Sequence, residues 1–306
     1  MRSAATEGAF AAQRQARFRL QRIALYTPQK PEIHMAQAKI NPNGTLKGKV
    51  ALVTGASRGI GEAIAARLAM EGAKIVASAR TEKSGESKLP GTLADTVERI
   101  KRAGGEATLV RADLAQASDR ERLVATAVAT YGPVDILVNN AAITYFMPVS
   151  EFSEKRFKLM MEVQVYAPFH LSQLVLPKMR ERRAGAIVNI SSPAGIHPKP
   201  PYAGGRGGTV YGMCKAALER FTTGLASEVY DDNIAVNVVS PGLVATPGVA
   251  LHGLINERTK DRVQPIEFIA EAVYRLALAD PSKLTGRVLY AEPFLKELDV
   301  TPSALV

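Results

Sequence analysis

The sequence predicts an α/β fold: a single doubly wound parallel sheet of about seven strands, flanked by helices on both faces. Short apolar runs alternate with segments of helical periodicity from about residue 47 to residue 291, which is typical of parallel strands joined by crossover helices. A glycine-rich turn follows the first apolar run. No change in composition after residue 45 marks a second domain, so we expect one domain over residues 46–306.

Residues 1–45 differ from the remainder and are expected to form a flexible, basic extension. The first 34 residues contain six basic and two acidic side chains and no long apolar run, so a secretory signal is not indicated. An organelle transit peptide over residues 1–34 and an over-extended start, with Met35 as the initiator, both remain open.

The whole chain carries a formal net charge of +10, but outside the first 34 residues its basic side chains are scattered. We find no nucleic-acid-binding motif and no apolar run long enough to span a bilayer. The single cysteine, Cys214, excludes an internal disulfide and a cysteine-based metal cluster. These features predict a cytoplasmic protein that binds neither nucleic acid nor metal.

The elements follow in order along the chain. The expected strands are 50–53, 74–79, 107–110, 134–138, 186–190, 235–239 and 287–291. The expected helices are 61–71, ending before Gly72; 92–103; 118–131, capped by Ser118; 153–176; 210–230; and 267–279. Ligands of such sheets bind beyond the carboxyl ends of the strands, where all of the following motifs lie.

The turn after the first strand contains Gly55, Gly59 and Gly61. A strand, a glycine turn and a helix together present free backbone N–H groups to a phosphate, and a side chain would hold that phosphate away. The second strand ends in Arg80 with no carboxylate nearby. An acidic residue there would bind the ribose of NAD, whereas arginine suits the extra phosphate of NADP. Arg58 offers a second guanidinium, so NADP(H) is favoured over NAD(H).

Polar residues follow the later strands. Asp113 follows the third strand, where it faces the adenine or caps a turn, and Asn139 and Asn140 follow the fourth. Ser192 follows the fifth strand, and Tyr211 and Lys215 lie one turn apart on the next helix. An ammonium near a phenol is expected to lower the phenol pKa. The phenol could then exchange a proton with a carbonyl or alcohol oxygen, while the serine binds that oxygen.

In combination these motifs resemble the short-chain dehydrogenase/reductase family over about residues 46–290. The matching motifs are Thr54–Gly61, Asn139–Ala142, Ser192, Tyr211 with Lys215, and Asn237 with Pro241 and Gly242. The resemblance implies a Rossmann-type sheet, a nicotinamide cofactor, Tyr211 as general acid/base, Lys215 on the cofactor ribose and Ser192 on the substrate oxygen. It further implies cofactor contacts from Ser57, Arg58, Ile60, Asp113, Leu114, Asn140, Val244 and Thr246.

Four departures from the family pattern stand out. Gln164 occupies the position of the family's catalytic asparagine, so its amide either still supports a proton relay or leaves the relay weakened. Ser192 and Tyr211 are 19 residues apart, which is more than is usual. Ala142 stands where the family usually has a glycine. The last strand continues into Glu292, where the family usually has two glycines. The stretch around Leu89–Leu93 is similar to hydroxysteroid dehydrogenase-like members.

The predicted function is that of an NADP(H)-dependent ketoreductase, an enzyme that interconverts a ketone and a secondary alcohol. Two alternatives remain open: a nucleotide-binding sensor or scaffold with little turnover, and a same-family epimerase or dehydratase. A small, largely apolar substrate is expected against Phe146, Met147, Pro193, Ile196, Tyr202, Leu243 and residues 249–254. The resemblance also implies a homodimer or homotetramer joined through the helices 153–176 and 210–230.

Overall fold

The computed structural model describes residues 39–202 and 207–306. Every described residue belongs to the second of the chain's two units, Gln37–Val306. The expected basic extension therefore lies outside the described residues except for its end. There, the backbone N–H of Asn41 donates to Met70 O at 2.9 Å and that of Leu46 donates to Glu71 O at 2.9 Å.

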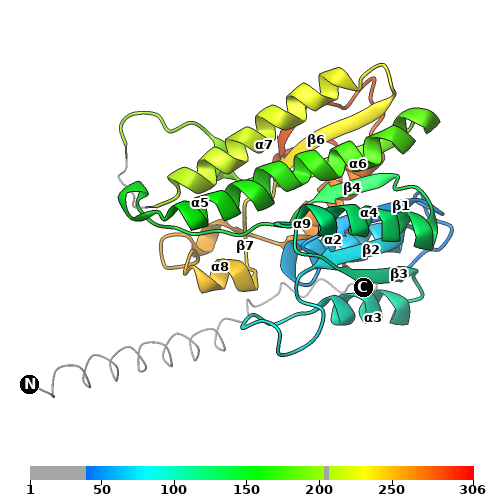
Figure 1. Cartoon of the computed structure of the whole chain (residues 1–306), viewed down its shortest axis with the longest axis horizontal. Coiled ribbons are helices and arrows are strands. Elements are labelled where there is room, and N and C mark those ends of the chain that lie inside the picture. Colours follow the sequence, from blue (N-terminus) through cyan, green and yellow to red (C-terminus); the bar gives the residue numbers. More distant parts are fainter. Residues whose placement is uncertain (1–38, 203–206) are drawn as a thin grey trace, which may run out of the picture. The chain divides into compact units, whose positions relative to one another are not determined.

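A seven-stranded parallel sheet forms the centre of this second unit, as predicted. Its strands lie in the spatial order β3-β2-β1-β4-β5-β6-β9 (Figure 1). Their bounds are Val50–Thr54 for β1, Lys74–Ala79 for β2, Ala107–Arg111 for β3, Ile136–Asn139 for β4, Gly185–Ile190 for β5, Ile234–Ser240 for β6 and Val288–Tyr290 for β9. The chain reverses its direction of winding between β1 and β4, which are paired through Leu52 and Leu137. Doubly wound sheets bind ligands at this switch point.

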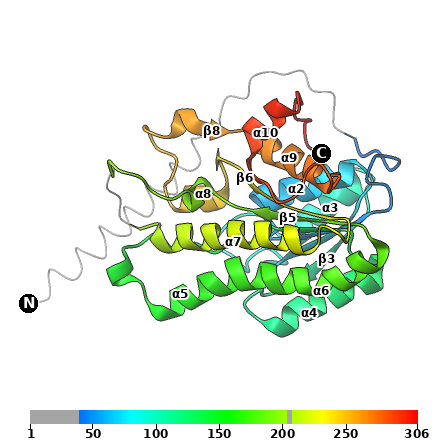
Figure 2. The same cartoon turned by 90° about the horizontal axis from the view of Figure 1, so that it is seen from above.

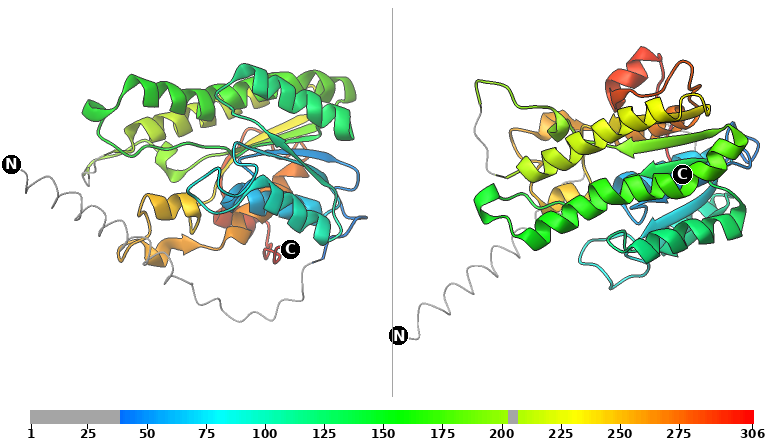
Figure 3. Two further views of the ribbon diagram at one scale, coloured as in Figure 1. Left: turned by 60° about the horizontal axis from the view of Figure 1, so that its bottom comes forward. Right: turned by 45° about the horizontal axis from the view of Figure 1, so that its top comes forward.

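Helices cover both faces of the sheet, so the domain has three layers (Figure 3). One layer contains α2 (Gly59–Met70), α3 (Leu93–Arg102) and α9 (Ile266–Ala277). The other contains α4 (Ala117–Tyr131), α5 (Glu154–Met161), α6 (Ala167–Arg182) and α7 (Thr209–Glu228). Figure 2 shows α7 running beside α5 and α6.

The two large core clusters lie one on each face of the sheet, and a small third cluster is formed by Met160, Val210 and Cys214. All five residues of β1 are buried, as are all seven of β6. Strands that are covered on both faces need continuous apolar runs rather than alternating ones. This is why the strands could be recognised from short apolar runs.

Two helix predictions need correction. Ser118 does not cap α4: the helix begins at Ala117, and Gln116 is its N-cap residue. The helix expected over 153–176 is α5, followed by a π-helical segment, η2 (Glu162–Tyr166), and then α6, which passes through Pro177 to Arg182. The proline does not end the helix because burial of Val175, Leu176 and Met179 against the sheet holds this turn in place.

Several short elements were not predicted from the sequence. They are η1 (Val149–Glu151), η3 (Pro193–Gly195), β7 (Leu243–Val244), α8 (Pro247–Leu251), η4 (Lys260–Arg262), β8 (Val263–Gln264) and α10 (Ala291–Glu297). Strands β7 and β8 pair with each other outside the main sheet. Within residues 39–202 and 207–306, no helix is both long enough and apolar enough to cross a membrane.

Candidate functional site

A cavity of about 1510 Å³ opens at the carboxyl ends of the strands, around the switch between β1 and β4. Its volume exceeds the roughly 300–1,000 Å³ of a site for one drug-sized ligand, so a dinucleotide and a substrate could share it. Fourteen of the predicted site residues line it: Gly55, Ser57, Arg58, Gly59, Ile60, Gly61, Arg80, Asp113, Leu114, Asn140, Ser192, Tyr211, Val244 and Thr246. Lys215 and Gln164 are not among the lining residues.

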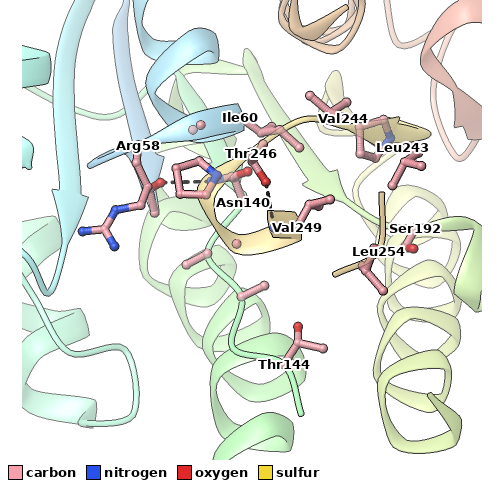
Figure 4. A pocket seen from close by; sticks show the side chains of 18 of the residues that line it. Arg58, Ile60, Asn140, Thr144, Ser192, Leu243, Val244, Thr246, Val249 and Leu254 are labelled. Atoms are coloured by element: carbon pink, nitrogen blue, oxygen red, sulfur yellow. Dashed lines mark hydrogen bonds between the residues drawn. The ribbon is translucent and has the colours of Figure 1, made fainter. Parts of the chain in front are cut away.

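The glycine turn forms a tight cradle at one end of the cavity. A Cβ atom on Gly61 would collide with the Gly55 carbonyl oxygen and lie 2.5 Å from Asn140 Nδ2. A Cβ on Gly59 would lie 3.2 Å from Thr246 Cγ2, so Thr246 closes over the turn (Figure 4). No side chain larger than hydrogen fits at Gly61, and the start of α2 presents its backbone to the cavity.

Asn140 ties the turn to the neighbouring strand. Its Nδ2 donates to Thr54 O at 2.8 Å and to Gly55 O at 3.3 Å, while its backbone N–H donates to Thr54 Oγ1 at 3.0 Å. The asparagine therefore holds the ends of β1 and β4 together, which keeps the cradle open beside the small residues Ala141 and Ala142.

Two guanidinium groups lie at this end of the cavity. Arg58 donates to Ser87 Oγ at 3.0 Å and to Gly91 O at 2.8 Å, so it anchors the loop after β2. Arg80 is exposed and lines the cavity. Burial, and then the nearby charge of Arg80, lower the pKa of Arg58. An anion bound between the two guanidinium groups would relieve the repulsion that acts on Arg58.

Buried polar atoms in the cavity wall fit a polar ligand. Ser78 Oγ, Ser240 Oγ and Arg58 Nε are buried, and none of them has a hydrogen-bond partner among the described residues. Buried polar atoms without a partner are uncommon in folded proteins, and these three lie where a bound ligand could supply the missing hydrogen bonds. Together with the glycine cradle, they indicate that these residues fit a dinucleotide.

Ser192 and Tyr211 meet at the other end of the cavity, with Ser192 far from Arg58 (Figure 4). Burial raises the pKa of Tyr211, and a hydrogen bond with Ser192 acts in the opposite direction. Burial outweighs that hydrogen bond, so in the chain alone the pKa of Tyr211 lies above its usual value, opposite to the expected net direction. Tyr211 is therefore protonated at neutral pH and can donate a proton.

Lys215 is buried beneath Tyr211. Its Nζ donates to Ile190 O at 2.9 Å and lies 5.6 Å from the centroid of the Tyr211 ring. Burial lowers the Lys215 pKa to about 8, although Cys214 and Glu219 act to raise it. The ammonium is thus present at neutral pH and lies close to the phenol without being bonded to it.

Gln164 lies at the centre of the π-helical segment η2 and is buried. Its Nε2 donates to Ile143 O at 2.8 Å, and its Oε1 has no hydrogen-bond partner among the described residues. Ile143 and Val163 line the cavity. The amide therefore lies just behind the cavity wall, with one acceptor still available.

The substrate end is partly as predicted. Phe146 packs edge to face on Tyr211, with centroids 5.6 Å apart, and on His252, with centroids 5.0 Å apart. The expected residues that line this part of the cavity are Phe146, Pro193, Leu243, Val249, Leu251, His252 and Leu254. Met147, Ile196 and Tyr202 are not among the lining residues, and Tyr202 is 71% exposed.

The sequence did not single out Gln264 or Glu292 as lining residues, although both line the cavity. Gln264 Nε2 donates to Glu292 Oε2 at 2.6 Å, and a Cβ on Gly242 would lie 2.8 Å from Gln264 Oε1. The pair therefore supports the turn after β6. Glu292 was noted as a departure from the family ending, but its contact with Gln264 depends on β8, for which the sequence gives no signal.

Comparison with known proteins shows extensive similarity. A family model described as short chain dehydrogenase matches residues 49–252. The chain is 36% identical over 266 residues to human dehydrogenase/reductase SDR family member 4, covering 84% of this chain and 91% of that protein. It is 33% identical over 260 residues to bovine hydroxysteroid dehydrogenase-like protein 2, covering 84% of this chain and 60% of that one.

A solved structure is also similar. It is that of a metagenomic short-chain oxidoreductase in complex with NADP, which superimposes with a TM-score of 0.65 at 31% identity. The match covers 79% of this chain and 96% of that one.

Proposed function

The chain belongs to the short-chain dehydrogenase family and is an NAD(P)-dependent enzyme of that family, and from this premise we propose that it is an NADP(H)-dependent oxidoreductase interconverting a ketone and a secondary alcohol. One observation carries the proposal: Ser192 and Tyr211 share a cavity with the glycine cradle at its opposite end. A dinucleotide spans the distance between such a cradle and the reacting atoms.

When bound, the nicotinamide supplies the hydride. The chain's own residues supply position and protons. Gly55, Gly59 and Gly61 form the cradle, and the Ser192 hydroxyl donates a hydrogen bond to the substrate oxygen. Tyr211 donates a proton to that oxygen during reduction and takes it back during oxidation. The Lys215 ammonium stabilises the phenolate that remains.

Gln164 is proposed to support proton return to Tyr211 through its free Oε1. A buried acceptor without a protein partner is commonly satisfied by an ordered water. Its amide, held by Ile143 O, would fix the position of such a water behind the cavity wall.

The proposed preference for NADP(H) is supported by the neighbouring guanidinium groups of Arg58 and Arg80. Replacing Arg80 with alanine should weaken NADPH binding by about 10- to 100-fold, because a hydrogen bond to a charged group contributes roughly 1.5–3 kcal/mol. NADH binding should be nearly unchanged. Fluorescence titration of both cofactors measures the effect.

The matched control is Arg102→Ala, which removes an exposed arginine whose partner is Glu98 on the same helix. It should leave both affinities unchanged. Equal loss of NADPH and NADH affinity in Arg80→Ala would contradict the assignment of Arg80 to the extra phosphate.

The proposed substrate is largely apolar, since Phe146 packs against Tyr211 where the reacting carbonyl must lie. Phe146→Ala should raise KM for apolar ketones about tenfold, since burying an aromatic side chain contributes roughly 1.5–3 kcal/mol. Steady-state kinetics would show this, with Leu278→Ala, an exposed residue outside the cavity, as control. An unchanged KM would place the substrate elsewhere.

We also propose a homo-oligomer joined through α5, α6 and α7. These helices and the segment η2 between α5 and α6 carry exposed large apolar side chains, namely Phe157, Tyr166, Phe169 and Met213, and such surfaces are typical of subunit interfaces. A cytoplasmic setting is supported only by the free, buried thiol of Cys214.

A further inference from the structure

Glu219 lies on the same face of α7 as Tyr211 and Lys215, one turn beyond the lysine. Its Oε1 accepts a hydrogen bond from Ser191 Oγ at 2.6 Å. Ser191 follows β5 directly and is buried in the cavity wall beside Ser192. The carboxylate therefore joins helix α7 to the end of strand β5, immediately before the serine that is proposed to bind substrate.

The same carboxylate packs under the turn that carries Ser192. Helix η3 begins directly after Ser192, whose Oγ accepts from the backbone N–H of Ala194 at 3.2 Å. A Cβ atom on Gly195 would lie 2.7 Å from Glu219 Oε1. Because Gly195 has no side chain, the carboxylate can approach this turn closely. Glu219 thus contacts both sides of the short segment that positions Ser192.

The charge of Glu219 acts on its neighbours. On α7 it favours the charged form of Lys215. On β9 it raises the pKa of Tyr290, although burial is the larger cause. Cys214, the other titratable neighbour of Lys215, has its own pKa raised by burial. Together with Cys214, the Glu219 carboxylate therefore acts against the effect of burial on the Lys215 ammonium.

We propose that Glu219 is a positioning residue of the reaction, which holds the Ser191–Gly195 segment in place and sets its carboxylate one helical turn from the Lys215 ammonium. This inference rests on the proposed function of Ser192, Tyr211 and Lys215. Loss of the carboxylate charge should let Lys215 lose its proton at lower pH, which would remove the cation that stabilises the Tyr211 phenolate.

The test compares Glu219→Gln with the wild type. Glutamine retains an acceptor for Ser191 and nearly the same volume, so only the charge is removed. In the pH profile of kcat for NADPH-dependent ketone reduction, the alkaline limb should move about one pH unit lower, the size of shift expected when an opposite charge nearby is lost. At pH values above the limb, kcat should fall about tenfold. Glu228→Gln, an exposed site near the end of α7, is the matched control.

Gly195→Ala provides a second variant. Its methyl group would meet the end of the flexible Glu219 side chain rather than the backbone, so the fold should persist while the carboxylate moves. The alkaline limb should shift in the same direction as in Glu219→Gln. If the alkaline limb of the kcat profile lay at the wild-type pH in both variants, the proposal would be overturned.

A measurement that does not require turnover tests the role of Glu219 separately from the proposed function. The pH dependence of the Lys215 ¹³Cε chemical shift, followed by NMR in the cofactor-free protein, reports the lysine pKa directly. Its midpoint should fall by about one unit in Glu219→Gln and stay in place in Glu228→Gln. Absence of ketone turnover in the wild type would count against the proposed function. An unshifted Lys215 midpoint in Glu219→Gln would count against the role of Glu219.

Discussion

Tyr211→Phe is expected to lower kcat for NADPH-dependent ketone reduction by about 10²- to 10⁴-fold, the contribution typical of a positioned general acid. The phenylalanine ring retains the packing against Phe146 but has no proton to donate. NADPH binding should change little, because the glycine cradle lies at the other end of the cavity. Absorbance at 340 nm gives the rate, and fluorescence titration gives the affinity.

The matched control is Tyr230→Phe, which removes a hydroxyl from an exposed tyrosine just beyond α7. Its kcat should equal that of the wild type. If Tyr211→Phe retained most of its activity, the proton would have to come from another group, and the assignment of the general acid would fail.

Glu271→Ala is expected to lower the free energy of unfolding by about 3 kcal/mol, the lower end of the cost of breaking a buried ion pair, because Arg67 keeps Glu71 as a second partner at 2.9 Å. Glu271 is fully buried on α9, and its Oε2 accepts from Arg67 Nε of α2 at 2.6 Å. The Arg67 guanidinium also lies 3.9 Å above the centroid of the Tyr274 ring, so it cannot reach water without disturbing the contact between α2 and α9.

Urea denaturation measures this loss, with Glu98→Ala as control. Glu98 pairs with Arg102 on the surface of α3, where both side chains are more than half exposed. Exposed pairs contribute about 0–1 kcal/mol, so the control should unfold almost like the wild type. If Glu271→Ala and Glu98→Ala lowered the free energy of unfolding equally, the ion pair between Arg67 and Glu271 would not be structurally important.

The main elements of the fold could be predicted because each strand of a parallel sheet covered on both faces requires a continuous apolar run, and such a run is visible in the sequence. Runs such as Val50–Thr54 are buried along their whole length, and the glycines after β1 are required by close backbone approach. The similarity to hydroxysteroid dehydrogenase-like proteins, first indicated around Leu89–Leu93, is supported by the bovine relative.

Short elements were missed because tertiary contacts stabilise them rather than local periodicity. Strand β7 has only two residues, and its pairing partner β8 lies about twenty residues further along the chain. The start of α4 was misplaced for a related reason: Ser118 is a strong capping residue by type, but Asp113 and Asp119 instead join the loop to the helix, with the backbone N–H of Asp113 donating to Asp119 Oδ2 at 2.8 Å.

The sequence predicted which residues line the site more accurately than it predicted the directions of their pKa shifts. The spacing of Tyr211 and Lys215 correctly predicted that they share a helix face. It could not show that the phenol is buried or that Lys215 donates to Ile190 O. Burial depends on surrounding elements such as the segment that carries Phe146, and it reverses the expected direction of the Tyr211 pKa.

The most direct test of the central claim follows the hydride itself. NADPH carrying deuterium at the transferable position of the nicotinamide would be incubated with a panel of apolar ketones, and the alcohols analysed by mass spectrometry. The proposed function predicts alcohol with deuterium on the carbinol carbon, formed by the wild type and lost in Tyr211→Phe. Tight binding of NADPH without any deuterated alcohol across the panel would contradict it and favour a nucleotide-binding role without turnover.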